Sequence, residues 1–519
     1  MKHYYRFVIF IFIILFSAPL SQTYAQKIIK GKVVSVQNLQ PLEGVTVTLL
    51  PEKISVVTDQ LGNFIFKKIR ETGNTILQVS TIGYEFKQLP VEELYRNSNN
   101  ILLATQNVEL KSVIISSRNG DHYKPISKTD IAMRGVNNSQ EILRIIPGIV
   151  IGQHQGGGKA EQIFLRGFDA DHGTDFRLEI DGMPVNMVSH AHGQGFADSH
   201  FLIPETVDNI DFKKGPYAAE KGDFATAGFV DFNTRNSLNE NMVKLEAGQF
   251  NTYRAMGMFK LLGDKARSKE QSWYVASEYR YSDAYFDSPQ HFKRFNLFTK
   301  YNGKISGNSY LSMSANTFWS KWNASGQVPD RAVDKGLIGF YGAIDPNEGG
   351  ITYRTNFNAQ LLTSLNNGDI IKNQLYYSNA HFDLHTNFTF FLEDSVNGDQ
   401  IRQKEARSMA GYNGSYHHTS TIGKVMLNTE AGLQVRYDMT RNSELSHTKN
   451  RYTLLLPMKL GDITSLSISP YISETFKFNE HFSINAGLRL TSSFINTKIN
   501  SQLIPRCLVL ALTKPMQIR

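Results

Sequence analysis

Five of the 14 histidines in the chain lie between positions 154 and 200, with several aspartates among them. Imidazole and carboxylate groups are ligands that zinc, copper, nickel and iron accept in proteins. In an extended segment His190 and His192 leave the backbone on the same face, so this pair could share one metal ion. The candidate residues for a metal or another ligand are His154, Asp169, Asp171, His172, His190, His192, Asp198 and His200.

Two other interpretations of these histidines stay open. They could belong to a hydrogen-bonded loop network, or they could pack against another part of the chain. Metallohydrolase chemistry is not favoured, because the spacing His-x-His-x-Asp-His that such sites use is absent around His190 and His192. No pairing of a nucleophile with a base stands out elsewhere, so we expect no catalytic residues and no enzyme.

The histidines lie within a segment that predicts short strands separated by glycine-bearing turns, from residue 156 to residue 235. Asp181-Gly182 predicts a hairpin turn, because this pair tolerates positive φ at low cost. Residues 139–148 predict a short helix that Ser139 caps and Pro147-Gly148 ends. The glycine run at 156–158 lacks the Gly-Lys-Ser/Thr of a phosphate loop, and we expect a flexible loop near a ligand.

The first 25 residues have the features of an export signal. Lys2 and Arg6 precede an apolar run at residues 7–16, and Thr23-Tyr24-Ala25 fits a cleavage site before Gln26. Nucleic-acid binding is not expected, because the net charge of +8 is scattered rather than gathered in a basic stripe. The single cysteine, Cys507, excludes an internal disulfide framework.

Three further patterns complete the domain organisation. Residues 28–105 alternate in short apolar runs, which predicts about seven strands in a small sandwich. A β-prone run at residues 108–117 centres on Val113, Ile114 and Ile115. From residue 242 onward, longer runs alternate apolar and polar residues, which is typical of a transmembrane β-barrel with about eleven or twelve strands. The connection from 322 to 350 predicts a long extracellular loop.

Four motifs in this order resemble the plug domain of TonB-dependent outer-membrane receptors. They are Leu165-Arg166-Gly167, Asp181-Gly182-Met183-Pro184-Val185, Lys214-Gly215-Pro216-Tyr217 and Ala227-Gly228-Phe229-Val230-Asp231-Phe232. Residues 28–105 are similar to the carboxypeptidase-regulatory-like domain that often precedes the plug in receptors of the Bacteroidetes type. The motifs there include Pro41-Leu42-Glu43-Gly44-Val45 and Gly62-Asn63-Phe64.

The resemblance implies partners and roles for several residues. Val113, Ile114 and Ile115 would be the TonB box, a strand that pairs with the energy-transducing TonB protein by β-augmentation; a plain connecting strand is the alternative. The plug charges would form a releasable latch of salt bridges to the barrel wall. These latch candidates are Arg166, Asp181, Lys213 and Glu220.

The expected organisation is a mainly β protein of the outer membrane, in contact with its lipid. It would consist of a signal peptide (1–25), a β-sandwich (26–105), a TonB-box segment (106–118), a mixed α/β plug (119–236) and an antiparallel barrel (237–519). The barrel has about half of the family's 22 strands, and residues 504–514 break the alternation, so we expect a truncated barrel.

The expected function is active transport of a scarce small-molecule ligand, such as a metal ion or a metal complex. The alternatives are an outer-membrane protein that binds or signals without transport, and an inactive truncated receptor. No resident cofactor is expected.

Overall fold

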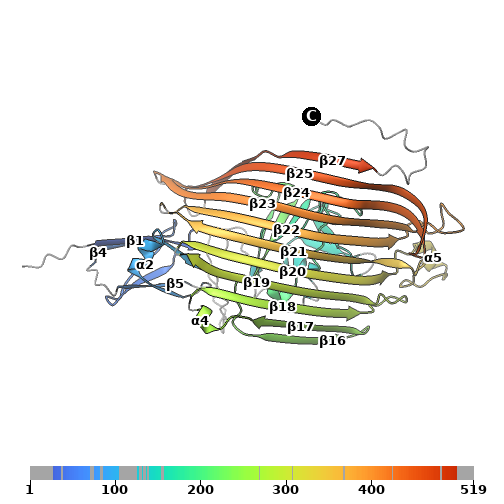
Figure 1. Cartoon of the computed structure of the whole chain (residues 1–519), viewed down its shortest axis with the longest axis horizontal. Coiled ribbons are helices and arrows are strands. Elements are labelled where there is room, and N and C mark those ends of the chain that lie inside the picture. Colours follow the sequence, from blue (N-terminus) through green and yellow to red (C-terminus); the bar gives the residue numbers. More distant parts are fainter. Residues whose placement is uncertain are drawn as a thin grey trace, which may run out of the picture. The chain divides into compact units, whose positions relative to one another are not determined.

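The computed structural model describes residues 27–36, 39–69, 75–81, 84, 86–103, 126–127, 131, 136, 139–153, 157–267, 269–306, 308–365, 367, 369–423, 425–479 and 482–499 (Figure 1). The predicted signal peptide, the TonB-box candidates Val113, Ile114 and Ile115, His154 and the segment 504–514 lie outside these residues. The chain divides into two compact units, Met1–Gln106 and Asn107–Arg519.

The first unit contains two small sheets around one apolar core, as the alternation predicts. Ile29, Val47, Phe66 and Leu77 are among its fully buried side chains. A short helix, α2 (Val91–Arg96), follows the last strand of one sheet, and the sequence pattern does not predict it. One sheet has the order β4 (Asn63–Ile69), β1 (Lys27–Ser35), β7 (Asn100–Leu103), and the other β3 (Ile54–Val57), β2 (Thr46–Leu50), β5 (Ile76–Ser80), β6 (Lys87–Pro90).

The second unit begins with a compact set of short strands, which we call the plug. Its central sheet has the order β13 (Met183–Pro184), β12 (Phe176–Ile180), β15 (Gly228–Thr234), β14 (Val207–Lys214), β8 (Ile126–Ser127). A smaller sheet has the order β11 (Phe168–Asp169), β10 (Gln162–Leu165), β9 (Ile149–Gly152). The predicted hairpin is confirmed, because Asp181 and Gly182 adopt φ of 48° and 71° between paired Ile180 and Met183.

The predicted helix near residue 140 is shorter and tighter than expected. Residues Gln140–Ile145 form a 3-10 helix, η1, which ends where Ile146 turns extended before Pro147. The predicted cap was wrong, since the Ser139 side chain makes no capping hydrogen bond. Its Oγ instead donates to the carbonyl oxygen of Ser199, 2.7 Å away, and ties η1 to the histidine-bearing segment.

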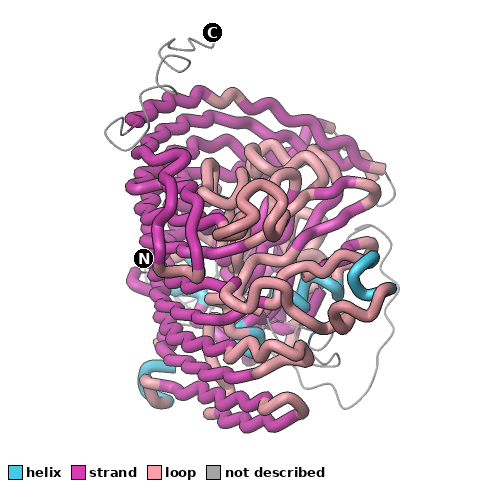
Figure 2. The backbone as a smooth tube through the Cα atoms, turned by 90° about the vertical axis from the view of Figure 1, so that its right-hand side faces the viewer, coloured by secondary structure: helices cyan, strands magenta, loops and turns pink. Residues whose placement is uncertain are grey.

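The rest of the unit is one antiparallel sheet, which we call the wall. From β16 to β26 each strand pairs with the next in sequence, so the order is a simple meander (Figure 1), and Figure 2 shows these strands stacked side by side; β27 pairs with β25. Its strands are β16 (Met242–Gly248), β17 (Thr252–Lys260), β18 (Gln271–Ser282), β19 (Phe292–Ser306), β20 (Ser309–Ala324), β21 (Glu348–Ser364), β22 (Ile370–Thr386), β23 (Ile401–Ile422), β24 (Val425–Lys449), β25 (Thr453–Lys477), β26 (Ser483–Arg489) and β27 (Ser492–Ile499).

Strand β19 shows the two faces of the wall. Arg294, Asn296 and Lys300 are buried toward the plug, whereas Phe295 and Leu297 between them are exposed. A polar interior and an apolar exterior are the signature of a transmembrane barrel, so this expectation is confirmed. The predicted long loop is residues 325–347, with the short helix α5 (Asp330–Asp334). No helix within the described ranges is long and apolar enough to cross a membrane.

Strands β26 and β27 both pair with β25 and lie one after the other along its outer edge. The break between them falls opposite Pro470, whose carbonyl oxygen accepts a hydrogen bond from the Leu490 amide at 3.1 Å. In an antiparallel ladder, the residue facing Leu490 would also donate an N–H, and proline has none. Pro470 therefore interrupts the ladder and divides this edge into two segments.

Candidate functional site: the interface between plug and wall

Three of the candidate histidines come together around Phe196 in the plug. The His190 ring stacks on Phe196 with centroids 4.2 Å apart and planes within 5°. The rings of His172 and His192 lie 4.7 Å apart beside them. Phe382 of β22 closes the group from the wall, 4.6 Å from His190. We call His172, His190, His192, Phe196 and Phe382 the histidine cage.

Polar groups of β23 hold the loop that carries the cage. The Ala191 amide donates to Glu405 at 2.7 Å, and Gln403 donates to the Ala191 carbonyl at 3.0 Å. Gln403 also contacts His192 Nδ1 at 2.9 Å. His190 Nε2 lies 3.9 Å from a Glu405 oxygen. The cage is therefore a contact between plug and wall, which is the packing that the sequence left open as one interpretation.

The rings of the cage are neutral at neutral pH. Burial and the nearby Lys159 ammonium lower the pKa of His172 to about 4. Burial also lowers the pKa values of His190 and His192 well below the usual range, helped by nearby Arg407 and Lys159 respectively. Neutral imidazole is the form that binds metals. Yet the described residues contain no group of three or more His, Cys, Asp or Glu placed to hold a metal ion.

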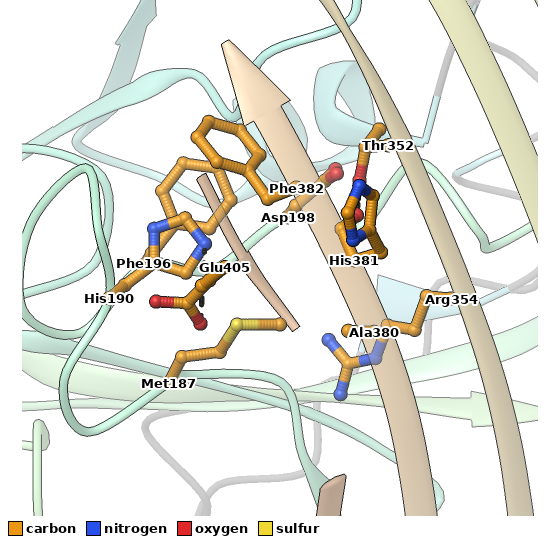
Figure 3. A pocket seen from close by; sticks show the side chains of 10 residues that line it. All are labelled: Met187, His190, Phe196, Asp198, Thr352, Arg354, Ala380, His381, Phe382 and Glu405. Carbon is orange, nitrogen blue, oxygen red and sulfur yellow. Dashed lines mark hydrogen bonds and ion pairs between the residues drawn. The ribbon is translucent and has the colours of Figure 1, made fainter. Parts of the chain in front are cut away.

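A pocket lies beside the cage, between the plug and strands β21 to β23. Figure 3 shows the Arg354 guanidinium and the His190 ring on its two sides. Arg354 is buried, donates to the Val185 carbonyl at 3.2 Å and lies 4.7 Å from the Phe201 ring. The lining residues are Met187, His190, Phe196, Asp198, Thr352, Arg354, Ala380, His381, Phe382 and Glu405.

The remaining candidate ligands are divided between two places. Asp198 and His200 form a buried pair, with 2.6 Å between Oδ1 and Nδ1, and the His200 ring stacks over Phe318 of β20. Asp169 and Asp171 lie at the exposed end of the small sheet. Asp171 reaches His172 Nε2 at 3.4 Å, and Asp169 accepts the Asp171 amide. The seven candidates within the described residues thus do not converge on one point.

Only Asp181 of the four latch candidates makes a side-chain ion pair with the wall in the described part of the chain. Its carboxylate lies 3.3 Å from Lys300 Nζ, and Lys300 also donates to Thr234. Glu220 contributes its backbone instead, because Gln434 donates to its carbonyl oxygen at 2.8 Å. Arg166 and Lys213 are exposed and pair with no wall side chain among the described residues, so the expected salt bridges from these two are not seen there.

A two-pronged charge contact between plug and wall, at Glu205, was not predicted. Glu205, in the plug segment η2 (Pro204–Thr206), accepts two hydrogen bonds from Arg254 at 2.7 and 2.6 Å. Arg254 also pairs with Glu278 at 2.6 Å, and Glu278 with Arg294 at 2.8 Å. Arg254 and Glu278 are almost fully buried. The sequence does place charged residues at inward-facing positions of the wall strands. Their partners cannot be assigned from it, because the register of the strands against the plug is not known from sequence.

Backbone carbonyls of the plug meet donors from the wall on the other side. Arg436 donates to the Asn186 carbonyl at 2.9 Å, as Arg354 does to Val185 and Gln434 to Glu220. The wall neutralises its own charges there: Arg407 pairs with Glu405 and Asp438, and Arg436 pairs with Asp438.

The glycine run meets the wall at Trp322. Gly158 is buried, and a Cβ atom added to it would overlap the indole ring. The Gly157 amide donates to Gln290 at 3.2 Å. The described part of the run is therefore packed against β20 and the end of the β18–β19 loop, in contrast to the free loop that the sequence suggested.

The sequence matches two described families. Residues 121–229 match the TonB-dependent receptor plug domain, and residues 29–115 match the CarboxypepD_reg-like domain. The vitamin B12 transporter BtuB of Vibrio vulnificus strain YJ016 is 26% identical over 147 residues, which are 28% of this chain and 22% of that protein. BtuB of strain CMCP6 is 29% identical over 187 residues, 34% of this chain and 29% of that protein.

Solved structures share the fold at low identity. The unliganded ferric citrate transporter FecA has a TM-score of 0.61 and 14% identity, covering 73% of this chain and 57% of FecA. The ferripyoverdine receptor of Pseudomonas aeruginosa has a TM-score of 0.57 and 14% identity, covering 80% and 62%. The chain thus spans less than two thirds of these relatives. The chain thus carries a region that matches the CarboxypepD_reg-like domain, then one that matches the plug domain, within a fold that solved transporters and receptors share, and this is the domain order of TonB-dependent receptors of the outer membrane.

Proposed function

We propose that this receptor imports a small-molecule ligand across the outer membrane by TonB-driven displacement of its plug. The observation that carries the proposal is the way the plug is held. Ion pairs such as Glu205–Arg254 and hydrogen bonds from the wall to plug carbonyls fasten it inside the curved sheet. Such contacts can be exchanged for water when the plug moves, so a pulling force can release them one by one.

The pull would act through Val113, Ile114 and Ile115, the segment that resembles a TonB box. In the bacterium that carries the gene, Val113→Pro should abolish uptake of radiolabelled ligand and leave binding to whole cells intact. Proline removes a main-chain donor that strand addition needs. Asn119→Pro, six residues further along the chain and outside the candidate box, is the matched control and should transport normally. Normal uptake by Val113→Pro would place the box elsewhere.

We propose a metal complex or a corrinoid as the cargo. The relatives support this class, since their names refer to vitamin B12, ferric citrate and ferripyoverdine. Growth of the gene deletion on limiting iron, zinc, copper, vitamin B12 or glycan should show a defect on one metal complex or on the corrinoid. A defect on glycan alone would contradict the proposed class. Binding without uptake, together with a transcriptional response, would favour a signalling role.

Direct binding of a metal ion by the cage has a separate test. Calorimetric titration of the whole chain in detergent with zinc, copper or nickel compares wild type with the His190→Ala, His192→Ala double variant. Binding that this variant loses, and that weakens between about pH 7 and 5, would assign the two imidazoles as ligands. The packing seen around Phe196 favours the opposite result, with equal and weak binding by both proteins.

A further inference from the structure

Three carboxylates lie in a row across the central sheet of the plug. Glu179 on β12 is in register with Asp231 on β15, and Asp231 is in register with Asp211 on β14. Residues directly opposite each other in paired strands project from the same face, with Cβ atoms about 4.5–5.5 Å apart. We call Glu179, Asp231 and Asp211 the carboxylate row.

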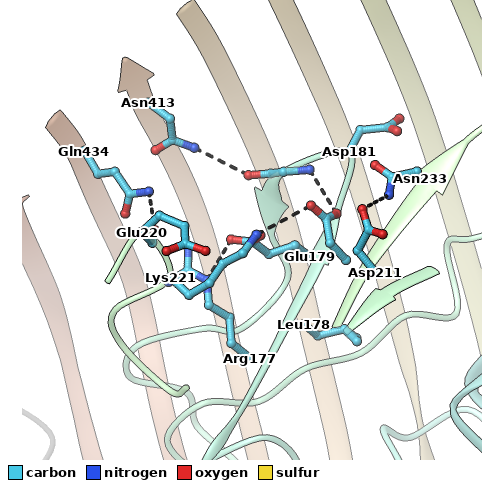
Figure 4. A network of polar contacts seen from close by, with 12 residues as sticks. Arg177, Leu178, Glu179, Asp181, Asp211, Glu220, Lys221, Asn233, Asn413 and Gln434 are labelled. Carbon is cyan, nitrogen blue, oxygen red and sulfur yellow. Dashed lines mark hydrogen bonds and ion pairs between the residues drawn. The ribbon is translucent and has the colours of Figure 1, made fainter. Parts of the chain in front are cut away.

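The positive groups at this row are unevenly shared. Arg177 Nε lies 2.7 Å from Glu179 and Lys221 Nζ 2.5 Å from Glu179, so both cations serve the same carboxylate (Figure 4). Lys221 reaches Asp231 only at 3.6 Å. Asp211 accepts a hydrogen bond at 3.0 Å from the Asn233 amide, which carries no charge. The row therefore has three carboxylates and two cations in direct contact with it, and the positive charge that is lacking is at Asp211 and Asp231.

The surroundings do not make up this deficit. Asp181, in the turn that follows β12, has its own partner in Lys300. The wall presents neutral amides, since Gln434 donates to the Glu220 carbonyl and Asn413 to Gln374, and a cation, Arg489, near Glu179. The other charged or titratable groups that face the row are Lys213 and Glu220 of the plug, and Arg489 and Tyr376 of the wall.

We propose that Asp211 and Asp231 share one proton, and that loss of this proton loosens the pairing of β14 with β15. Two like charges directly opposite each other in a sheet oppose pairing, and one proton removes that repulsion. Two such interacting groups titrate as a pair rather than singly.

The direction of the pH effect follows from the same geometry. Burial and the neighbouring Glu179 and Asp211 carboxylates raise the pKa of Asp231 to about 6, against the opposing effect of Lys221. Burial also raises the pKa of Asp211. An aspartate in an unfolded segment titrates near ~3.9. The free-energy penalty of the two like charges on the folded sheet is thus absent at about pH 4 and below, grows as the pH rises, and is complete above about pH 6. The plug sheet is tightest in acid.

Hydrogen–deuterium exchange of the whole chain in detergent tests the proposal, with labelling times scaled to the intrinsic rate at each pH. The readout is the opening constant of peptides that cover β14 and β15. In the wild type it should rise roughly 10- to 100-fold between pH 4.5 and 7.5. Asp231→Asn and Asp211→Asn should each flatten this profile, because either change removes one charge of the pair while keeping an acceptor oxygen.

Asp169→Asn is the matched control, since this aspartate lies at the exposed end of the small sheet, away from the row. It should keep the wild-type profile. A wild-type slope in Asp231→Asn would overturn the proposal. If either variant fails to fold, infrared spectra of the wild type labelled with ¹³C-aspartate replace it. A protonated aspartate band at pH 5 that disappears by pH 7.5 supports the shared proton, and its absence at pH 5 refutes it. Neither measurement depends on transport.

Discussion

The two sides of the plug are attached to the wall by different means. On the side of β17 to β19, a plug carboxylate, Glu205, enters a chain of buried charges that runs through Arg254, Glu278 and Arg294. On the side of β21 to β24, the wall pairs its own charges and offers donors to plug carbonyls at Val185, Asn186 and Glu220. We call these the charge side and the carbonyl side.

The difference determines which sequence changes each side can tolerate. The charge side depends on the identity of plug side chains, Glu205 and Asp181, so a single substitution there leaves buried charges without partners. The carbonyl side depends on the path of the plug backbone, because carbonyl oxygens are present whatever the side chain. We therefore expect a substitution of Glu205 to lower the free energy of unfolding strongly and a substitution of Glu220 to change it little. Substitutions of the contacting wall residues should lower it on both sides.

The largest effect is expected on the charge side from Glu278→Gln. This change leaves Arg254 and Arg294 buried and without the carboxylate they share, at a cost of about 3–5 kcal/mol in the free energy of unfolding. Urea denaturation of the chain in detergent measures it. Glu246→Gln, on the neighbouring partly exposed glutamate, should change stability by less than about 0.5 kcal/mol. Equal effects of the two changes would contradict a buried charge chain.

The second prediction concerns the histidine cage, which belongs to the carbonyl side. Its lowered pKa values mean that the folded state holds neutral rings. Stability is therefore complete above about pH 6.5 and is lost as the pH falls toward 4. For His172 the loss amounts to about 3 kcal/mol at full titration. Amide exchange in residues 187–197 should rise in acid, opposite to the trend predicted for β14 and β15.

His172→Leu should weaken this acid response, because it removes one of the groups that must take up a proton. His291→Leu is the control, as the His291 side chain is 55% exposed and lies outside the cage. An acid response that is unchanged in His172→Leu would show that the cage does not carry it.

A third effect is expected at Gly158, where the wall leaves no room for a side chain. Gly158→Ala should destabilise the chain by about 1–3 kcal/mol, because the new methyl group would overlap the Trp322 ring. Gly152→Ala is the matched change within the plug, since its Cβ would meet Phe164 at an ordinary 3.7 Å. Urea denaturation compares the two. A larger cost for Gly152→Ala would contradict the close contact at Trp322.

The smallest effect is expected on the carbonyl side, where two substitutions distinguish a contact to the Glu220 backbone from a contact to its side chain. Gln434→Ala removes the donor to the Glu220 carbonyl and should cost about 1 kcal/mol in unfolding free energy. Glu220→Gln keeps that carbonyl and should cost less than about 0.5 kcal/mol. The reverse order would restore Glu220 as a side-chain latch, as the sequence first suggested.

The sequence could predict those features that depend on neighbours in the chain. The hairpin at Asp181-Gly182 follows from local backbone preference, and the inward and outward faces of β19 follow from alternation. The alternation of short apolar runs likewise predicts the seven strands in the described part of the first unit. The helix α2 was missed because a segment of six residues is too short to show a helical period.

The contacts between plug and wall could not be predicted in this way. Whether Glu205 or Lys213 meets an opposite charge depends on which wall strand lies beside each part of the plug, and on the register of that strand. The histidines show the same limit: composition marked the region, but only the packing on Phe196 and Phe382 shows which of them meet. Backbone contacts such as those at Asn186 leave no trace in side-chain identity.

Pro470 also has a consequence for how β26 and β27 separate from β25. Hydrogen bonds along a continuous ladder open and close cooperatively, so a tear that starts at one end of a strand tends to run along it. The missing donor at Pro470 separates the seven residues of β26 from the eight of β27. Opening of one segment then stops at the proline and leaves the other paired with β25. Strands β26 and β27 should therefore separate from β25 as two short segments, each of which limits the length of backbone that is exposed at one time.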